Sequence, residues 1–450
     1  MLKLNFFLLI VFIPFVFLNC QSQKINDKPN VIIIYTDDQG SIDLNIYGAK
    51  DLVTPHMDAL VRGGVRFTQF YGAPVCSPSR ASLMTGKTPQ RAGVPGNIPS
   101  VPVTERGLSG SQYTMAEMFK DADYKTAHIG KWHLGDQPGM LPNDQGFDYS
   151  FGHHVGCIDN YSHFYYWRGP NRHDLYRNGK EVFYDGQFFP QLMVEEATAF
   201  IEENKEDPFF MYFAMNTPHY PYQGTPEWLK YYQDKGVAYP RDLYAAFLST
   251  QDDKIGALIA KLESLDLMEN TIIVFQADNG YSTEERAHFG GGNAGPYRGA
   301  KSCLFEGGYR VPAAITWRGN LPENEIRGQF SVNADWMPTL AALCNIDLDT
   351  QDLDGKSLVA VINDPEAKSQ HNEIFTWQHG KQWATRSGKW KLLGNPVDKT
   401  NKSPLTEKDK LFLVDLEKDP GEMNNLAETY PEKVKELESQ YLNWLITTEN

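Results

Sequence analysis

Lys28-Pro-Asn-Val-Ile-Ile-Ile-Tyr-Thr36, followed at once by Asp37-Asp38, is the stretch that decides the fold class. A run of β-branched apolar residues that ends in carboxylates is typical of a strand buried on both faces, with its acidic groups at the C-terminal end. Further strands are predicted over Lys125–Ile129, Pro208–Met215, Thr271–Ala277 and Val311–Trp317. Amphipathic stretches between them predict helices over Thr114–Asp121, Pro190–Asn204, Asp242–Leu265 and Asn333–Leu343. This alternation indicates an α/β fold, in which helices sandwich a large, mostly parallel sheet.

Polar side chains follow four of these strands. In open α/β sheets, ligands bind beyond the carboxyl ends of the strands. The polar residues in that position are Asp37-Asp38, Lys131 with His133, Asp278-Asn279 and, a few residues past its strand, His219. Packing alone does not explain so many polar groups at strand ends, and they mark the expected site.

The pattern changes after about residue 368. Short alternating segments at Ile374–Gln378, Gln382–Thr385, Trp390–Leu393 and Leu411–Asp415 precede an amphipathic stretch over Pro431–Leu445. We therefore expect a catalytic domain over residues 28–368 and a C-terminal α+β subdomain over residues 369–450, built as a small antiparallel sheet with one helix.

Composition narrows the class of protein. The chain has 450 residues, a formal net charge of −15, 41% hydrophobic residues and 13% aromatic residues. This is enough apolar material for a substantial core. The acidic balance argues against a nucleic-acid partner, which usually meets a broad basic face. A few basic side chains and a divalent cation can still bind a small anion.

The N-terminus resembles an export signal. A basic start and an apolar run over Leu4–Leu18 are typical of a signal peptide, because a membrane span needs about 20 residues. Cys20 closes this run, as in bacterial lipoproteins, where that cysteine carries the lipid. Residues 1–19 are thus predicted to be a signal peptide, with Cys20 lipidated; the alternative is ordinary cleavage nearby. The protein is expected to be exported, either to the periplasm or to the outer membrane or cell surface of a bacterium, with membrane attachment through Cys20. Three cysteines besides Cys20 and Cys76 allow one disulfide at most.

Cys76-Ser-Pro-Ser-Arg80, followed by Ala-Ser-Leu-Met-Thr-Gly86, is the most specific motif. It resembles the modification motif of type I, formylglycine-dependent sulfatases, within the alkaline phosphatase-like superfamily. The resemblance extends from Lys28 to the stretch Leu411–Leu426. It implies that Cys76 is converted to 3-oxoalanine (formylglycine) by a formylglycine-generating enzyme or its equivalent. The hydrated aldehyde would attack sulfur and then eliminate sulfate, which replaces one difficult step by two easier ones.

The resemblance also implies roles for the strand-end residues. Lys131, in Gly130-Lys-Trp-His133, would bind sulfate, and His133 would be the base that triggers elimination; alternation along an extended segment would put both on one side. Lys301 and His219 would act on the leaving oxygen, and which of them gives the proton stays open. Arg80 would stabilise the residue-76 diol, whereas Arg298 and Arg310 are predicted to be structural.

A metal site is the other expected feature. Asp37, Asp38, Asp278 and Asn279, together with modified Cys76, are the ligands that the resemblance implies. Oxygen ligands suit a hard cation, so calcium is predicted, with magnesium as the less favoured choice. A turn or helix cap is the alternative explanation for Asp37-Asp38 taken alone.

Substrate contacts are predicted from rings and hydrogen-bond donors beyond these motifs. The candidates are His153, His154, Arg168, Arg172, His173, Trp377 and His379. The alternative is a surface loop with its own small core.

The predicted function is hydrolysis of sulfate esters, with S–O cleavage, in a sulfated carbohydrate. The substrate is expected to be a polysaccharide or its oligosaccharides, of ulvan, carrageenan, fucoidan or glycosaminoglycan type. Two alternatives are a phosphodiesterase or phosphonate monoester hydrolase of the same superfamily, and a non-catalytic carbohydrate-binding surface protein.

Overall fold

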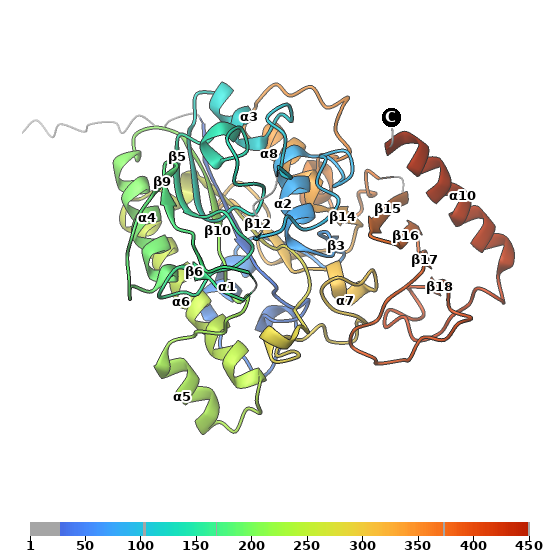
Figure 1. Ribbon diagram of the computed structural model, residues 1–450. Helices are drawn as coiled ribbons and strands as arrows, with labels where there is room; N and C mark the ends of the chain where they lie inside the picture. Colours follow the sequence, from blue (N-terminus) through green and yellow to red (C-terminus); the bar gives the residue numbers. More distant parts are fainter. Residues whose placement is uncertain (1–27, 102–104, 168, 372–373, 449–450) are drawn as a thin grey trace, which may run out of the picture.

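The computed structural model describes residues 28–101, 105–167, 169–371 and 374–448 (Figure 1). The predicted signal peptide and Cys20 lie outside these residues. Within them, no helix has both the length and the apolar character needed to cross a membrane.

A ten-stranded sheet forms the centre of the molecule. Its order is β13-β2-β12-β11-β1-β10-β4-β5-β8-β9. The five central strands run parallel: β11 (Thr271–Ala277), β1 (Asn30–Thr36), β10 (Phe209–Ala214), β4 (Lys125–Lys131) and β5 (Tyr149–His153). The outer strands are β13 (Glu325–Arg327), β2 (Val65–Phe67), β12 (Ala313–Thr316), β8 (Tyr176–Arg177) and β9 (Lys180–Glu181). The predicted strand over Val311–Trp317 is present as β12, but it runs antiparallel to β11, so the sheet is mixed beyond its parallel centre.

Helices cover both faces of this sheet. Alternate residues of β1 point to opposite sides, and because they are apolar on both sides, both faces have to be buried. Ile32 and Ile34 pack in one core, with residues of α1 (Pro55–Arg62), α4 (Phe189–Glu203) and α6 (Arg241–Ser264). Val31 and Ile33 pack in the other, with residues of α2 (Cys76–Thr85), α3 (Met115–Asp121), α8 (Trp336–Leu343) and α9 (Val359–Asn363). The predicted α/β sandwich is thus confirmed.

The remaining elements are short. They are α5 (Pro226–Asp234), α7 (Glu306–Tyr309), the strand pairs β3 (Phe70–Tyr71) with β14 (Ser331–Val332) and β6 (Phe164–Tyr165) with β7 (Arg172–His173), and 3-10 helices at Asn45–Tyr47, Pro142–Gln145, Met268–Asn270, Glu285–Ala287 and Asn333–Asp335.

The C-terminal part is an antiparallel sheet with one helix, as predicted (Figure 1). It comprises β15 (Ile374–His379), β16 (Gln382–Ser387), β17 (Trp390–Gly394), β18 (Leu411–Asp415) and α10 (Pro431–Thr448). Trp383 of β16 stacks on Tyr441 of α10, with ring centroids 4.1 Å apart. The other face of the sheet packs on Tyr71, Phe305 and Tyr309 of the large domain.

Candidate active site

The register of β1 and β11 brings the acidic residues together. Thr36 pairs with Ala277, so Asp37-Asp38 and Asp278-Asn279 leave the sheet side by side. Asp38 adopts a left-handed conformation (φ 60°), and its backbone N–H donates to Asp278 Oδ1 at 3.1 Å. All these side chains are buried. Four oxygen-bearing side chains therefore gather at one point on the carboxyl edge of the sheet.

Cys76 faces this cluster from the first turn of α2. Its Sγ donates to Asp37 Oδ1 at 3.4 Å, and burial raises the pKa of the thiol well above its ordinary value. An unmodified Cys76 is therefore a protonated thiol and a poor nucleophile. Its position at a helix N-terminus suits an anion next to it.

Each carboxylate has a cationic partner. Lys131 Nζ lies 2.6 Å from Asp37 Oδ2, Lys301 Nζ lies 2.7 Å from Asp38 Oδ1, and Arg80 Nη2 lies 3.1 Å from Asp278 Oδ2. Arg80 also donates from Nη1 to the backbone oxygen of Lys131 at 2.9 Å, which ties α2 to the end of β4. The three cations make a buried pocket that can hold a small anion despite the acidic chain.

These charges set the protonation of Asp37 and Asp38. Although burial raises it, the nearby charges of Lys131 and Arg80 hold the pKa of Asp37 well below its usual range. Burial raises the pKa of Asp38 to about 7, although Lys301 lowers it, and the neighbouring carboxylates add to the rise. The raised pKa of Asp38 shows that its carboxylate is poorly compensated in this site, and a bound cation would favour its charged form.

The donor set fits a hard metal ion. Asn279 Nδ2 donates to Asp38 Oδ1 at 2.7 Å and to the Gly280 oxygen at 2.9 Å, which leaves Asn279 Oδ1 buried and without a partner. A buried carbonyl oxygen beside carboxylates is the ligand type that calcium prefers. Asp37, Asp38, Cys76 and His219 also present ligand atoms within 4.8 Å of one another, and His219 was not in the predicted ligand set.

His133 and His219 each have one ring nitrogen that carries no proton. His133 Nε2 lies 3.0 Å from the Ile98 oxygen and His219 Nδ1 lies 2.7 Å from the Tyr220 oxygen; since a carbonyl only accepts, both ring nitrogens are the N–H donors. His133 Nδ1 and His219 Nε2 are then proton acceptors, and His219 Nε2 lies 3.5 Å from Asp38 Oδ2. Burial holds the pKa of both rings well below its ordinary value, so both are neutral.

The reason given from sequence for pairing Lys131 with His133 is wrong. β4 ends at Lys131, and His133 has a left-handed backbone (φ 56°), so the chain does not alternate as an extended segment. The turn at His133, and not strand periodicity, places its ring at the cavity beside Cys76.

A cavity of about 140 Å³ opens over the cluster, and Cys76, His133, His219 and Lys301 line it. Other residues that line the cavity were not predicted from the sequence: Asn97, Ser100, Cys157, Tyr220, Glu284, Arg286 and Ser302, among others. Glu284 and Arg286 follow Asp278-Asn279 closely in the sequence, and this short spacing could have indicated that they lie near the site. Tyr220 donates to Glu284 Oε2 at 2.8 Å. Cys157, Cys303 and Cys344 are all free thiols.

The candidate substrate residues are scattered. His153 is buried beside Lys131, its partner in the β4–β5 register, whereas the ring of His154 stacks on Tyr176. Arg172 pairs with Asp136 and Asp174, and His173 pairs with Glu181. None of these lines the cavity beside Cys76.

The C-terminal candidates lie apart from that cavity too. Trp377 packs in the core against Tyr71 and Tyr309, and His379 borders a separate small cleft next to Pro74 and Pro78. Arg168 lies outside the described residues. Arg298 is buried and donates to Asp398, and Arg310 pairs with Glu306, so both hold loops as expected.

Comparison with known families decides between the alternatives. A family model described as Sulfatase matches residues 29–346, and one described as N-sulphoglucosamine sulphohydrolase, C-terminal, matches residues 297–447. The chain belongs to the sulfatase family. This sulfatase is therefore a sulfuric ester hydrolase, and the resemblance inferred from Cys76–Gly86 is confirmed.

Relatives match over most of the chain. Arylsulfatase from Hemicentrotus pulcherrimus is 33% identical over 436 residues, which cover 88% of this sulfatase and 77% of that protein. Arylsulfatase A from Bos taurus is 32% identical, covering 91% and 85%. N-acetylgalactosamine-6-sulfatase from Sus scrofa is 30% identical, covering 81% and 71%.

Solved structures share the fold. Ps i-CgsB, determined in complex with k-i-k-neocarrahexaose, superposes with a TM-score of 0.81 at 29% identity and covers 93% of this sulfatase and 92% of that chain. A protein from work on the metabolism of multiple glycosaminoglycans by Bacteroides thetaiotaomicron has a TM-score of 0.76 at 27% identity, covering 94% and 100%.

Proposed function

We propose that this sulfatase is exported and removes sulfate from a sulfated carbohydrate, with residue 76 as formylglycine and one calcium ion held by Asp37, Asp38, Asp278 and Asn279. The observation that carries the proposal is the convergence on one buried point of Cys76, an oxygen-only ligand set with the unpartnered Asn279 Oδ1, and the Lys131 and Lys301 ammonium groups.

Formylglycine would supply a hydroxyl nucleophile and calcium would supply positive charge at a sulfate oxygen. The protein's own residues do the rest. Lys131 and Lys301 offer ammonium donors to a tetrahedral anion from two sides of the carboxylate cluster. Arg80 fixes Asp278 and the end of β4, which keeps the ligand oxygens in place.

The two histidines divide the proton transfers. His133 Nδ1, unpartnered in the cavity wall, is the base that accepts a proton at the residue-76 end. His219 Nε2 and Lys301 Nζ both lie beside Asp38 and are the groups available to the leaving oxygen. Neutral His219 carries no proton on Nε2, so it can donate to the leaving oxygen only after Nε2 has accepted one, whereas the Lys301 ammonium can donate directly.

A carbohydrate is the substrate class that the relatives favour. N-acetylgalactosamine-6-sulfatase is named for a sugar, and Ps i-CgsB was determined with an oligosaccharide. Polymers of ulvan, carrageenan, fucoidan or glycosaminoglycan type remain the substrates to test. Export through the N-terminal segment, with a lipid on Cys20, fits a substrate too large to enter a cell.

A screen of defined sulfated oligosaccharides tests the proposal. Protein matured together with a formylglycine-generating enzyme should release inorganic sulfate from at least one of them, in a calcium-dependent reaction. Cys76→Ala should abolish release, whereas Cys344→Ala, which removes a buried thiol at the C-terminal end of α8 that does not line the cavity at Cys76, should not. Faster turnover of an aryl phosphate diester with manganese than of an aryl sulfate with calcium would refute the proposal.

A further inference from the structure

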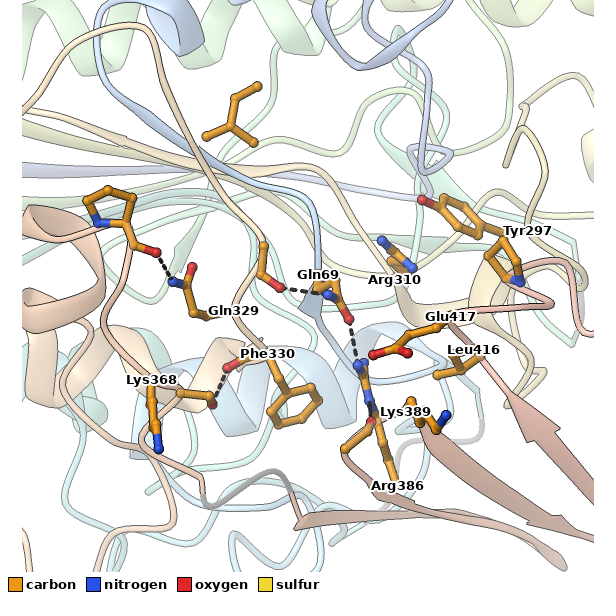
Figure 2. A pocket seen from close by; sticks show the side chains of 16 residues that line it. Gln69, Tyr297, Arg310, Gln329, Phe330, Lys368, Arg386, Lys389, Leu416 and Glu417 are labelled. Carbon is orange, nitrogen blue, oxygen red and sulfur yellow. Dashed lines mark hydrogen bonds between the residues drawn. The ribbon is translucent and has the colours of Figure 1, made fainter. Parts of the chain in front are cut away.

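A second and larger cavity lies between the large domain and the C-terminal sheet. Its volume is about 690 Å³, within the range of ligand sites, and it shares no lining residue with the cavity at Cys76. Figure 2 shows Gln69, Phe330 and Arg386 around it, with the hydrogen bond between Gln69 and Arg386 drawn. Segments that follow β2, β13 and β18 and the β16–β17 turn all contribute to its wall.

Arg386 is a buried cation without an anionic partner of its own. Its side chain donates to the Gly388 oxygen at 2.9 Å, to Tyr71 Oη at 2.6 Å and to Gln69 Oε1 at 2.5 Å, all of which are neutral. It forms no ion pair with any carboxylate in the part of the chain that the structure describes. These three bonds use three of its five N–H groups. A charge buried without a counter-ion is costly, and this points to an anion as the missing partner.

The buried carboxylate of Glu306, which shares the hydroxyl of Tyr71 with Arg386, already has cationic partners. Glu306 pairs with Lys391 at 3.0 Å and with Arg310 at 3.1 Å, and it accepts from Tyr71 Oη at 2.7 Å. Arg310 and Lys391 pair with Glu306, and Lys391 also pairs with Glu422, so these two carboxylates already have cationic partners without Arg386. The Arg386 guanidinium is therefore an additional positive charge, which reaches Glu306 through the hydroxyl of Tyr71.

The rim of the cavity adds cations and ring faces (Figure 2). Lys368 is exposed and forms no ion pair among residues 28–101, 105–167, 169–371 and 374–448, while Lys389 pairs with Asp415 at 3.2 Å. Glu417 is the carboxylate in the lining. The Arg310 guanidinium lies 4.2 Å from the Tyr297 ring centroid. A chain with a net charge of −15 thus gathers basic groups beside aromatic rings here, a combination that suits an anionic sugar.

The cavity lies at the same edge of the sheet as the catalytic site. β2 is antiparallel to β12, which is antiparallel to β11, so β2 and β11 run in the same direction. Gln69 follows β2 just as Asp278 follows β11. β13 is four strand positions from β1, roughly 19 Å at about 4.8 Å a position. An oligosaccharide of several units can span that distance.

We propose that this cavity, lined by Arg386 and Lys368, binds a sulfate group carried by the carbohydrate chain while another part of the same chain lies at Cys76. The identity of the ligand rests on the proposed function, whereas the anion specificity rests on the unpaired Arg386. The site would favour long, multiply sulfated substrates over short ones.

Charge reversal at Lys368 tests this, because the side chain is exposed and the fold does not depend on it. Lys368→Glu should raise KM roughly three- to tenfold for a long sulfated oligosaccharide and leave turnover of a small aryl sulfate unchanged. Lys180→Glu is the matched control, since Lys180 is an exposed lysine of β9, at the opposite edge of the sheet from β13. Equal KM values for Lys368→Glu and Lys180→Glu on the long substrate would overturn the proposal.

Binding to the Cys76→Ala protein separates this proposal from catalysis. Titration calorimetry should show weaker binding of the long oligosaccharide after Lys368→Glu is added, even if no substrate is ever turned over. Inorganic sulfate and an unsulfated oligosaccharide form the other arms. If inorganic sulfate at equal concentration binds as tightly and with the same dependence on Lys368, the assignment to a carbohydrate chain is overturned.

Discussion

Replacing Arg80 by methionine should destabilise the protein strongly, because Arg80 is a buried tie between α2, β4 and the acidic cluster. Its guanidinium is fully buried, lies 3.1 Å from Asp278 Oδ2 and 3.8 Å from Asp37 Oδ1, and donates to the Lys131 oxygen at 2.9 Å. In calcium-free protein, methionine fills the space of the side-chain stem but leaves the buried Asp278 carboxylate without its ion-pair partner. Breaking a buried pair in this way costs about 3–5 kcal/mol.

The expected shift in thermal unfolding follows from chain length. At about 2.1 cal/mol/K of unfolding entropy per residue, 450 residues give ~0.9 kcal/mol/K for a chain that unfolds as one unit. The loss of stability then lowers Tm by roughly 3–5 °C. Arg318→Met is the control: Arg318 also pairs with two carboxylates, at 3.2 and 3.5 Å, but it is 45% exposed and should lose less than about 1 kcal/mol.

A double-mutant cycle with Asp278→Asn locates the effect. Removing the carboxylate removes the uncompensated charge, so the double variant should be more stable than the sum of the single losses predicts, by about 1–3 kcal/mol. Chemical denaturation of the four proteins measures this coupling. Additive losses, or an Arg80→Met variant no less stable than Arg318→Met, would refute the account of Arg80 as a charge partner.

Three further predictions concern the metal, pH and the leaving group. Calcium at about 1,000 times its Kd should stabilise the protein by about 4 kcal/mol in denaturant melts, and Asn279→Ala should abolish most of that gain; identical melts with calcium and with a chelator would contradict the metal site. Burial raises the pKa of Glu422 from 4.5 to about 7 although Lys391 lowers it, so Glu422 contributes stability below pH 4.5 that is lost as pH rises through 7. The difference in free energy of unfolding between Glu422→Gln and the wild type, measured in urea titrations, should accordingly shift by ~3 kcal/mol in favour of the variant between pH 4 and pH 8. A difference that does not change with pH would contradict this prediction. His219→Ala should lower kcat by about 10²–10⁴ for a sugar sulfate, but far less for a nitrophenyl sulfate whose leaving group needs no proton; equal losses would exclude a role at the leaving oxygen.

Much of the site could be predicted because strand ends are visible in sequence. The apolar run over 30–36 ends in Asp37-Asp38 and the one over 271–277 ends in Asp278-Asn279, and parallel neighbours bring such pairs together. Asp37, Asp38, Asp278 and Asn279 therefore meet as expected. The position of Cys76 could be predicted in the same way, because the motif that follows it indicates the start of a helix, and α2 begins at Cys76.

Contacts that depend on loops could not be predicted. His133 lines the cavity because its backbone is left-handed, and the pattern of apolar and polar residues does not predict such a turn. Glu284 and Arg286 line the cavity from a loop. Trp377 was expected near the substrate, yet alternation in β15 turns it into the aromatic core between the two sheets. An aromatic residue in a strand indicates burial but does not say against which neighbour.

The buried ion cluster of Lys391, Glu306 and Glu422 was also invisible. The three residues come from β17, α7 and the loop after β18, and they meet only because the C-terminal sheet docks on the large domain. The sequence shows that these residues are charged, but only the packing of the C-terminal sheet on the large domain shows that they form ion pairs. The unpaired Arg386 beside them follows from the same docking.

Mass spectrometry of the peptide that contains residue 76, on protein of measured specific activity, tests the central claim most directly. We expect an aldehyde in place of the thiol, with sulfate release proportional to the fraction of chains converted. A preparation that is fully active with residue 76 still an intact cysteine would contradict it.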